Sequence, residues 1–245
     1  MSQALALPTR KDEDFRYADL AALAPLWPVA VETISVAAGE AGNLAMVLDG
    51  GEPVAREIAI VLGDGASFDL RLLNAPSAYG RVAVKVKLGR GASFTLGAAQ
   101  LAGGDQVVEI VTDVLHAQPD AVSRQVVRSV AGGQATANYL GKVRVARGAD
   151  GTDGEQSIRA MLLDRTATAN ARPELEIFAD DVKCAHGCAV GELDANGLFY
   201  MAQRGLPPAE AKKLMLQAFV AEAFAGAADE ERLLEAALAA LGRLV

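Results

Sequence analysis

The feature that most constrains the fold is an internal repeat. Leu62-Gly-Asp-Gly-Ala-Ser-Phe-Asp-Leu70 returns as Leu88-Gly-Arg-Gly-Ala-Ser-Phe-Thr-Leu96, at an offset of 26 residues, and a looser echo occupies residues 130–138. Repetition at a period of about 20–50 residues is typical of solenoids, in which each turn buries its inner face against the next turn. A pair of similar glycine turns in an ordinary β-sandwich is the alternative that the repeat leaves open.

Short apolar runs separated by Gly, Asn and Asp fill the chain from residue 29 to residue 205. The runs are Ile58–Leu62, Phe68–Leu72, Val82–Leu88, Val107–Val114, Val122–Val130, Lys142–Val145 and Leu175–Phe178. Many alternate apolar and polar residues, which is the period of a half-buried strand. Because no long amphipathic helix interrupts them, alternating βαβ units are not expected. Aromatic residues are only 5% of the chain, which suits a narrow interior filled by stacked small aliphatic side chains.

We therefore predict a mainly β chain, with a right-handed parallel β-helix (β-solenoid) core and short N-terminal and C-terminal helical segments. Residues 1–28 mix charges with a short amphipathic stretch that ends at prolines, and we assign them to an N-terminal helical arm. Residues 29–205 form the predicted β-helix core, and residues 206–245 form a C-terminal helical module.

The C-terminal module carries apolar residues at helical spacing. Pro207 and Pro208 can begin one helix, Gly226 interrupts the pattern, and Asp229 can cap a second helix. The apolar stripes either pack on the β body or dock a partner, and the sequence favours neither interpretation.

Charge and composition exclude several classes of protein. A net charge of −8 argues against a general nucleic-acid binder. Charged residues occupy positions 10–14, where a secretory signal needs its apolar stretch, and the run Ala21–Val31 is broken by prolines and too short to span a bilayer. Two cysteines exclude a disulfide scaffold and suit a reducing compartment. We expect a soluble, cytoplasmic protein without membrane or nucleic-acid partners.

Both cysteines and one of the two histidines lie within five positions, at Cys184, His186 and Cys188. If this segment is a strand, alternate residues share one face, so thiol, imidazole and thiol stand in a row. Soft metals and iron–sulfur clusters prefer such ligands. Three ligands are too few for a closed structural zinc site. The alternatives are an open site, a site completed by another chain, or no metal.

Other chemistry is less well supported by the residues. A Cys–His nucleophile pair is a rival, but same-face neighbours on one strand lie about 7 Å apart, beyond hydrogen-bond reach. We expect His116, the other histidine, to be a surface or turn-capping residue.

A β-helix enzyme acting on carbohydrate or an acyl donor is the alternative function. Asp180 and Asp181 are adjacent, so on a strand they would face opposite ways and could not act as a pair.

The segment Leu175–Gly187, with its string Asp-Asp-Val-Lys-Cys-Ala-His-Gly, closely resembles the SufB/SufD family of the SUF iron–sulfur cluster assembly complex, and within it the SufD branch. Further stretches that resemble this family occur in the same order along the chain: Pro8–Lys11, Phe15–Leu20, His116 with Ser123 and Arg124, Thr152–Gln156, Asn170–Ile177 and Leu198–Gly205. The resemblance runs from the start to the tail and is densest over residues 110–205.

The resemblance implies a β-helix flanked by helices, in agreement with the repeat. It also implies a non-catalytic scaffold subunit that pairs with SufB through the β-helix and docks the SufC ATPase through its C-terminal helices. ATP hydrolysis is expected in SufC, and a self-paired dimer is possible when the chain is alone. A transient iron–sulfur cluster would form at the SufB–SufD interface, with His186 as the leading metal ligand, Cys184 second, and no permanently bound cofactor.

Two features depart from the family pattern. The family usually has Ser or Thr before the histidine and Ala two residues after it, whereas this chain has Ala185 and Cys188. Cys188 is either an extra thiol ligand or a packed substitute for alanine, and we favour packing because a free cysteine is commonly buried. The region before the β-helix is also abbreviated.

Overall fold

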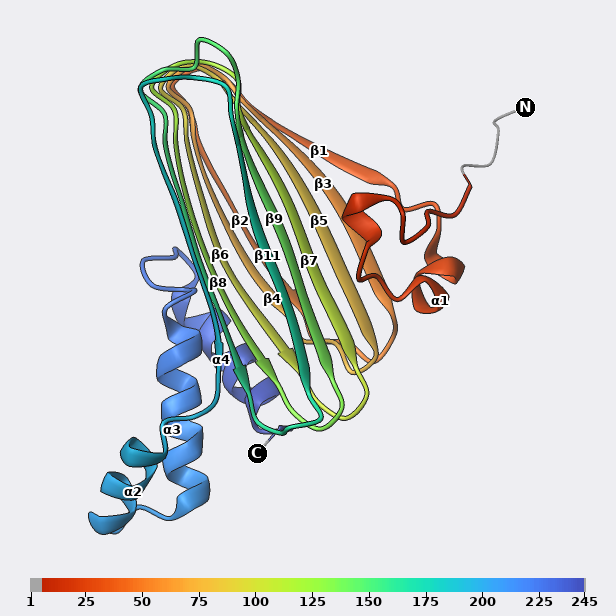
Figure 1. Ribbon diagram of the computed structural model, residues 1–245, viewed down its shortest axis with the longest axis vertical. Helices are drawn as coiled ribbons and strands as arrows, with labels where there is room; N and C mark the ends of the chain where they lie inside the picture. Colours follow the sequence, from red (N-terminus) through yellow and green to blue (C-terminus); the bar gives the residue numbers. More distant parts are fainter. Residues whose placement is uncertain (1–5, 245) are drawn as a thin grey trace.

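The computed structural model, which describes residues 6–244, is a parallel β-solenoid of about six turns with a few short helices (Figure 1). The first sheet has the strand order β1 (Val31–Val36), β3 (Val54–Leu62), β5 (Tyr79–Leu88), β7 (Val107–His116), β9 (Thr136–Val145) and β11 (Thr168–Ile177). The second sheet has the order β12 (Lys183–Gly191), β10 (Asp153–Leu162), β8 (Val122–Ala131), β6 (Ser93–Ala102), β4 (Ser67–Asn74) and β2 (Ala41–Leu48). The predicted mainly β solenoid is confirmed.

The internal repeat corresponds to two successive turns of the solenoid. Leu62 pairs with Leu88 and Phe68 with Phe94, so the two copies stack residue on residue. The echo at residues 130–138 has a different origin. It contains a turn at the opposite end of the strands, and the Gly132 amide donates a 2.9 Å hydrogen bond to the Ala102 carbonyl of the preceding turn. That segment therefore repeats the turn after β6, not the segment 62–70.

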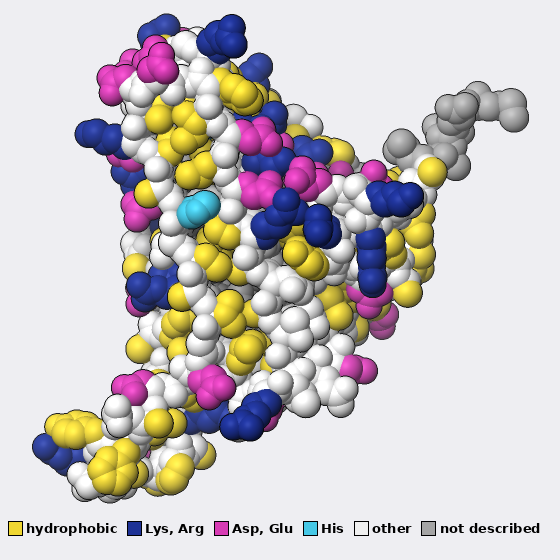
Figure 2. Space-filling model, in the orientation of Figure 1, with side chains coloured by type: hydrophobic (Ala, Val, Ile, Leu, Met, Phe, Trp, Pro, Cys, Tyr) yellow, Lys and Arg dark blue, Asp and Glu magenta, His cyan; other side chains and the backbone are white. Residues whose placement is uncertain are grey.

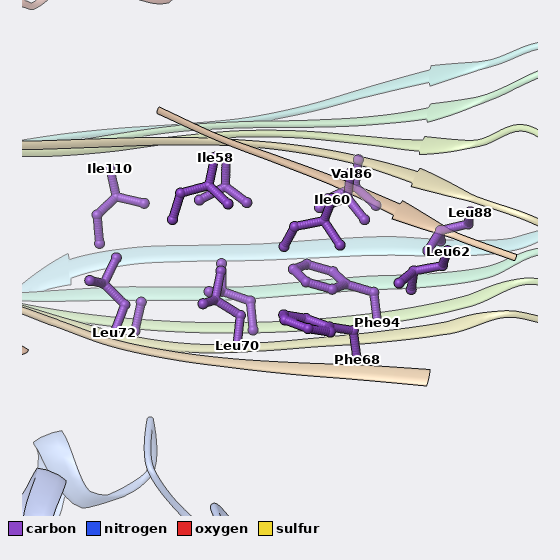
Figure 3. Close-up of a cluster of buried hydrophobic side chains, with 14 of the residues drawn as sticks. Ile58, Ile60, Leu62, Phe68, Leu70, Leu72, Val86, Leu88, Phe94 and Ile110 are labelled. Carbon is purple, nitrogen blue, oxygen red and sulfur yellow. The ribbon is translucent and has the colours of Figure 1, made fainter. Parts of the chain in front are cut away.

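Alternate side chains of both sheets point inward and meet in the core shown in Figure 3. The labelled core residues are Ile58, Ile60, Leu62, Phe68, Leu70, Leu72, Val86, Leu88, Phe94 and Ile110, all buried. Removing each such side chain from water stabilises the fold by about 1.5–3 kcal/mol. The seven apolar runs of the sequence all lie in strands, except that Phe178 belongs to the turn after β11.

The described part of the N-terminal arm, residues 6–28, lies against the outer face of the first sheet (Figure 1), and residues 1–5 of the predicted arm lie outside the described residues. Its helical segments are η1 (Glu13–Phe15), α1 (Leu20–Leu23) and η2 (Ala24–Leu26). Beneath them Arg81 and Glu109 form a buried ion pair at 2.5 Å. Arg81 donates to the Asp14 carbonyl at 2.8 Å, and Glu109 accepts from the Asp19 amide at 2.8 Å. The pair therefore fastens the arm to the sheet, because both charges are satisfied by arm backbone as well as by each other.

Three helices follow the last strand: α2 (Ala195–Gln203), α3 (Pro208–Ala221) and α4 (Glu230–Leu241). The helical region thus begins before the boundary expected at 206, because the Asp194 carboxylate caps α2 by accepting from the amides of Asn196 and Gly197. The predicted helix start at Pro208 is confirmed. The predicted cap at Asp229 is wrong in its mechanism, since that carboxylate pairs with Arg232 at 3.1 Å and makes no capping bond.

Helices α3 and α4 cover the outer face of the second sheet (Figure 1). Their apolar stripes join sheet residues in one buried cluster that includes Leu73, Leu101, Val130, Leu216, Val220, Phe224, Leu233 and Leu241. The approach is close at Gly97, where a Cβ atom would lie 1.8 Å from the Ala223 carbonyl oxygen. Packing on the body therefore accounts for the apolar stripes of these two helices.

Candidate functional site

The last turn of the solenoid presents two edge strands. Among the described residues, β11 pairs only with β9, and β12 pairs only with β10. Each strand therefore leaves one row of backbone groups without a strand partner. Such an edge is a ready template for another β-strand.

Cys184, His186 and Cys188 lie on β12, so the predicted strand is confirmed. We call these three residues the Cys–His–Cys row. They stand in register with Gly154, Gln156 and Ile158, respectively, which are interior residues of β10. Side chains in register on parallel strands point the same way, and we call each such series a column. Each residue of the row is therefore the last member of an interior column, at the open end of the solenoid.

No further turn covers the Cys–His–Cys row within the described chain. His186 and Cys188 are exposed, and Cys184 is half-buried. The expected packing of Cys188 is therefore not observed, since the residue is exposed and its thiol lies 3.8 Å from the Ala171 carbonyl oxygen. Figure 2 shows hydrophobic side chains gathered around a histidine on the face of the molecule turned to the viewer.

The electrostatic setting keeps both cysteines as thiols. Partial burial raises the pKa of Cys184, while a backbone hydrogen bond at Gly154 opposes this effect. Partial burial also raises the pKa of Cys188. Neither thiol is activated as a nucleophile, since activation requires a lowered pKa. Residues 6–244 contain no group of three or more His, Cys, Asp or Glu side chains able to hold a metal ion. The described chain thus presents separate ligands and no assembled metal site.

His116 is buried, contrary to the expectation of a surface residue. Its Nε2 atom lies 2.9 Å from the Ser123 hydroxyl inside the solenoid. Burial lowers the pKa of His116 to about 4, so its imidazole is neutral at physiological pH. Ser123 shares a column with Gly154 and Cys184, and a Cβ atom on Gly154 would lie 3.5 Å from the Cys184 sulfur. The pair therefore lies in the interior that leads to Cys184.

A second polar group, to which the sequence had assigned no role, lies inside the same turns. Thr112, Gln125, Tyr139 and Gln156 are all buried. The Thr112 hydroxyl donates to Gln125 Oε1 at 3.1 Å, and Gln156 Nε2 donates to the Tyr139 hydroxyl at 3.3 Å. Gln156 lies in the column that ends at His186. The stretch Thr152–Gln156, already noted in the sequence, was the available signal for this group.

Other family-like stretches hold successive turns together. Arg124 donates to the Asp153 carboxylate at 2.6 Å, which lowers the pKa of that carboxyl group. Asn170 donates to Asn138 Oδ1 at 2.8 Å. These contacts join neighbouring strands of the same sheet, so the residues have a structural role.

Asp180 and Asp181 lie in the turn between β11 and β12, not on a strand. The opposite orientation expected for adjacent residues of a strand therefore does not apply to them. The Asp181 carbonyl accepts a 2.7 Å hydrogen bond from the Gly151 amide of the preceding turn. This backbone contact stacks the two turns.

Helix α2 and the first half of α3 expose large hydrophobic side chains. Phe199 is 65% exposed, Tyr200 56% and Leu214 49%. The Arg204 guanidinium lies 4.7 Å from the centre of the Tyr200 ring. We call Phe199, Tyr200 and Leu214 the tip patch. Exposed aromatic side chains in one place are typical of interaction surfaces.

Comparison with known proteins agrees with this architecture. Residues 54–219 match the family model described as SUF system FeS cluster assembly, SufBD core domain. The chain belongs to this SufBD family. The matched region contains the strands from β3 to β12, including the whole Cys–His–Cys row, and extends through α2 into α3.

Several relatives share the core. The iron–sulfur cluster assembly protein SufD of Escherichia coli is 33% identical over 139 residues, covering 57% of this chain and 33% of that protein. SufD of Bacillus subtilis is 30% identical over 118 residues, covering 48% of this chain and 27% of that protein. The chloroplastic protein ABCI7 of Arabidopsis thaliana is 36% identical over 119 residues, covering 48% of this chain and 25% of that protein. The chain therefore spans a third or less of the length of these relatives.

The family supports a role in iron–sulfur cluster assembly within the SUF system. None of the helices in residues 6–244 is long and apolar enough to cross a membrane.

Proposed function

We propose that the chain is a non-enzymatic scaffold subunit of a SUF complex and that its Cys–His–Cys row takes part in building an iron–sulfur cluster. The observation that carries this proposal is the exposure of His186 and Cys188, with half-buried Cys184, on an unpaired edge strand of a SufBD core. Thiolate and imidazole are suitable ligands for iron.

The edges of β11 and β12 are the proposed surface for SufB. Unpaired backbone amides and carbonyls can continue both sheets into a second solenoid. Large apolar side chains flank the edge, with Ile177 39% exposed, Phe178 63% and Val190 48%. Covering them would add apolar burial to the strand pairing. The same edges could pair with a second copy of this chain when SufB is absent.

In this assembly the cluster is a cargo, and His186 and Cys184 are its proposed ligands on this side. The thiol of Cys184 must lose its proton before it binds iron, so cluster growth at this cysteine releases a proton. The remaining ligands would come from SufB. Cys188, which is exposed, could add a third ligand from this chain.

The proposed SufC ATPase contact uses the C-terminal helices. Because most apolar residues of α3 and α4 are buried against the second sheet, the tip patch is the exposed apolar surface that the described C-terminal helices offer for this contact. Deleting residues 206–245 would uncover the sheet, so a surface substitution is the cleaner test. We expect the Phe199→Glu variant to lose co-purification with SufC and to keep SufB.

The matched control for this docking test is Val61→Glu, which places a charge at another exposed hydrophobic position, 43% exposed, on the first sheet. The control should retain SufC. Equal SufC recovery with Phe199→Glu and with the unmodified chain would contradict docking through the tip patch.

The experiment that tests the whole proposal is purification of the tagged chain from its native cells without oxygen, followed by iron and sulfide analysis. We expect SufB and SufC in the complex and acid-labile sulfide together with iron. A chain that purifies alone as a monomer without iron would contradict the proposal. Hydrolysis of a carbohydrate or acyl donor by the purified chain would favour the enzyme alternative.

A further inference from the structure

We propose that Gln156 is a positioning residue for His186. Its side-chain carbonyl oxygen has no hydrogen-bond partner within residues 6–244 and receives the imidazole N–H when the exposed ring turns inward. This contact fixes one neutral tautomer and directs the lone pair of the other ring nitrogen out of the open end of the solenoid. This inference rests on the proposed function, since it assigns a partner to the leading cluster ligand.

The two side chains are neighbours in one column. Gln156 of β10 is in register with His186 of β12, and neighbouring strands lie about 4.8 Å apart. Gln156 is 1% exposed, whereas His186 is exposed at the end of the column. The imidazole therefore belongs to the residue that follows Gln156 in this column on the open side.

The hydrogen bonds of Gln156 leave its carbonyl oxygen free for this contact. Its Nε2 atom donates to the Tyr139 hydroxyl at 3.3 Å, which holds the amide nitrogen on the interior side. Its Oε1 atom is buried and has no hydrogen-bond partner among the described residues. An unpaired buried carbonyl oxygen is destabilising, so a nearby donor gains free energy by binding to it.

The neighbour on the inner side does not supply that donor. Gln125 is in register with Gln156, but its Oε1 atom accepts from Thr112 at 3.1 Å and from Tyr139 at 3.4 Å. Gln125 Nε2 remains without a partner and does not bond to Gln156. The open side of the column, where His186 lies, is the remaining direction from which a side-chain donor can approach.

The chemistry of the contact suits a metal ligand. A neutral imidazole has one N–H and one lone pair, and whichever nitrogen donates leaves the other to bind iron. Histidine ligands commonly donate their second N–H to a carbonyl oxygen, which fixes the tautomer and the ring orientation. Gln156 provides such an oxygen from a rigid strand.

The test uses the full chain labelled with ¹⁵N-histidine, because only two histidines are present. Long-range ¹H–¹⁵N spectra recorded at about pH 8.5, above the ordinary histidine pKa of about 6.5, report the tautomer of each ring. We expect His186 to favour one tautomer, and Gln156→Leu to change the tautomer ratio about fivefold, the effect of one ordinary hydrogen bond. The signal of buried His116 serves as an internal reference.

Two further variants separate positioning from a general effect on the fold. Gln156→Glu keeps an acceptor oxygen and should restore the tautomer preference. Gln125→Leu removes the polar side chain one strand further inside and should leave His186 unchanged. The same tautomer ratio in the unmodified chain, Gln156→Leu and Gln156→Glu would overturn the inference. If Gln156→Leu does not fold, a tautomer ratio in Gln156→Glu matching that of free imidazole would overturn it as well.

The iron readout distinguishes failure of this inference from failure of the proposed function. In the reconstituted complex, Gln156→Leu should weaken iron retention about tenfold, the size of effect typical when a partner of a histidine ligand is lost. Full retention together with an altered tautomer would refute the role of Gln156 in cluster building. Iron retention that survives His186→Ala would instead refute the proposed function, whatever the tautomer shows.

Discussion

His116 makes the stability of the solenoid depend on pH in a defined direction. Its pKa is about 4 in the folded chain because the ring is buried, whereas an unfolded histidine has a pKa of about 6.5. Below about pH 6.5 the unfolded chain therefore binds a proton that the native chain excludes. The free energy of unfolding must fall as the pH falls towards about 4, and it must be fully recovered above about pH 6.5.

The size of the effect follows from the two pKa values. Their separation lowers the free energy of unfolding by about 3 kcal/mol once the ring is protonated in both states, at about 1.36 kcal/mol per pKa unit. Between about pH 7.5 and pH 5 the contribution of this one ring is about 2 kcal/mol. Such a loss is a large part of the stability of an ordinary domain, which is about 5–15 kcal/mol.

Urea unfolding at both pH values, for the unmodified chain and for His116→Gln, measures this contribution. The variant cannot titrate at this position. Between about pH 7.5 and pH 5 its free energy of unfolding should therefore fall by about 2 kcal/mol less than that of the unmodified chain. The other ionisable groups are common to both chains and cancel in the comparison. Ser123→Ala is the control, because it removes the 2.9 Å contact to His116 while keeping the titrating ring. The same pH dependence in the unmodified chain and in His116→Gln would refute the reasoning.

Two further predictions concern how the solenoid holds its flanking segments. Gly97→Ala places a methyl group 1.8 Å from the Ala223 carbonyl oxygen. We expect the free energy of unfolding to fall by about 1–3 kcal/mol and proteolysis of the C-terminal helices to become faster. Gly50→Ala is the control, because its methyl group meets nothing within 4 Å, and it should behave as the unmodified chain. Arg81→Ala leaves the Glu109 carboxylate buried without its cation and should cost about 3–5 kcal/mol in urea unfolding, most of which the double variant Arg81→Met/Glu109→Leu should recover. A double variant no more stable than Arg81→Ala would argue against the unpaired charge as the cause.

Much of the architecture could be predicted from local patterns. The offset between the Leu62 and Leu88 segments favoured a solenoid over the β-sandwich alternative, and the structure shows that the two segments stack in register on adjacent turns. The alternation of apolar and polar residues predicted half-buried strands, and in β5 Lys85 and Lys87 are exposed between buried neighbours. These features depend on neighbours along the chain, which the sequence displays directly.

The residues whose environment differs from the sequence-based prediction are those whose surroundings depend on tertiary structure. His116 ends a strand, and its position is interior because it is in register with buried Leu88 and Val145 on the neighbouring strands. Cys188 would be packed in the middle of a solenoid, but it lies on the last turn, where nothing further covers it within the described residues. Asp229 stands where a cap was expected, yet Arg232 is close enough to take its carboxylate. Sequence spacing shows none of these tertiary partners.

The most direct measurement of the central claim is the iron and acid-labile sulfide content of the reconstituted SUF complex that contains the His186→Ala chain. Lys183→Ala, on the same strand and also exposed, is the matched control. We expect both complexes to assemble, the control to carry a normal amount of iron and sulfide, and the His186→Ala complex to carry little of either. A normal cluster yield in the His186→Ala complex would contradict the proposed role of His186.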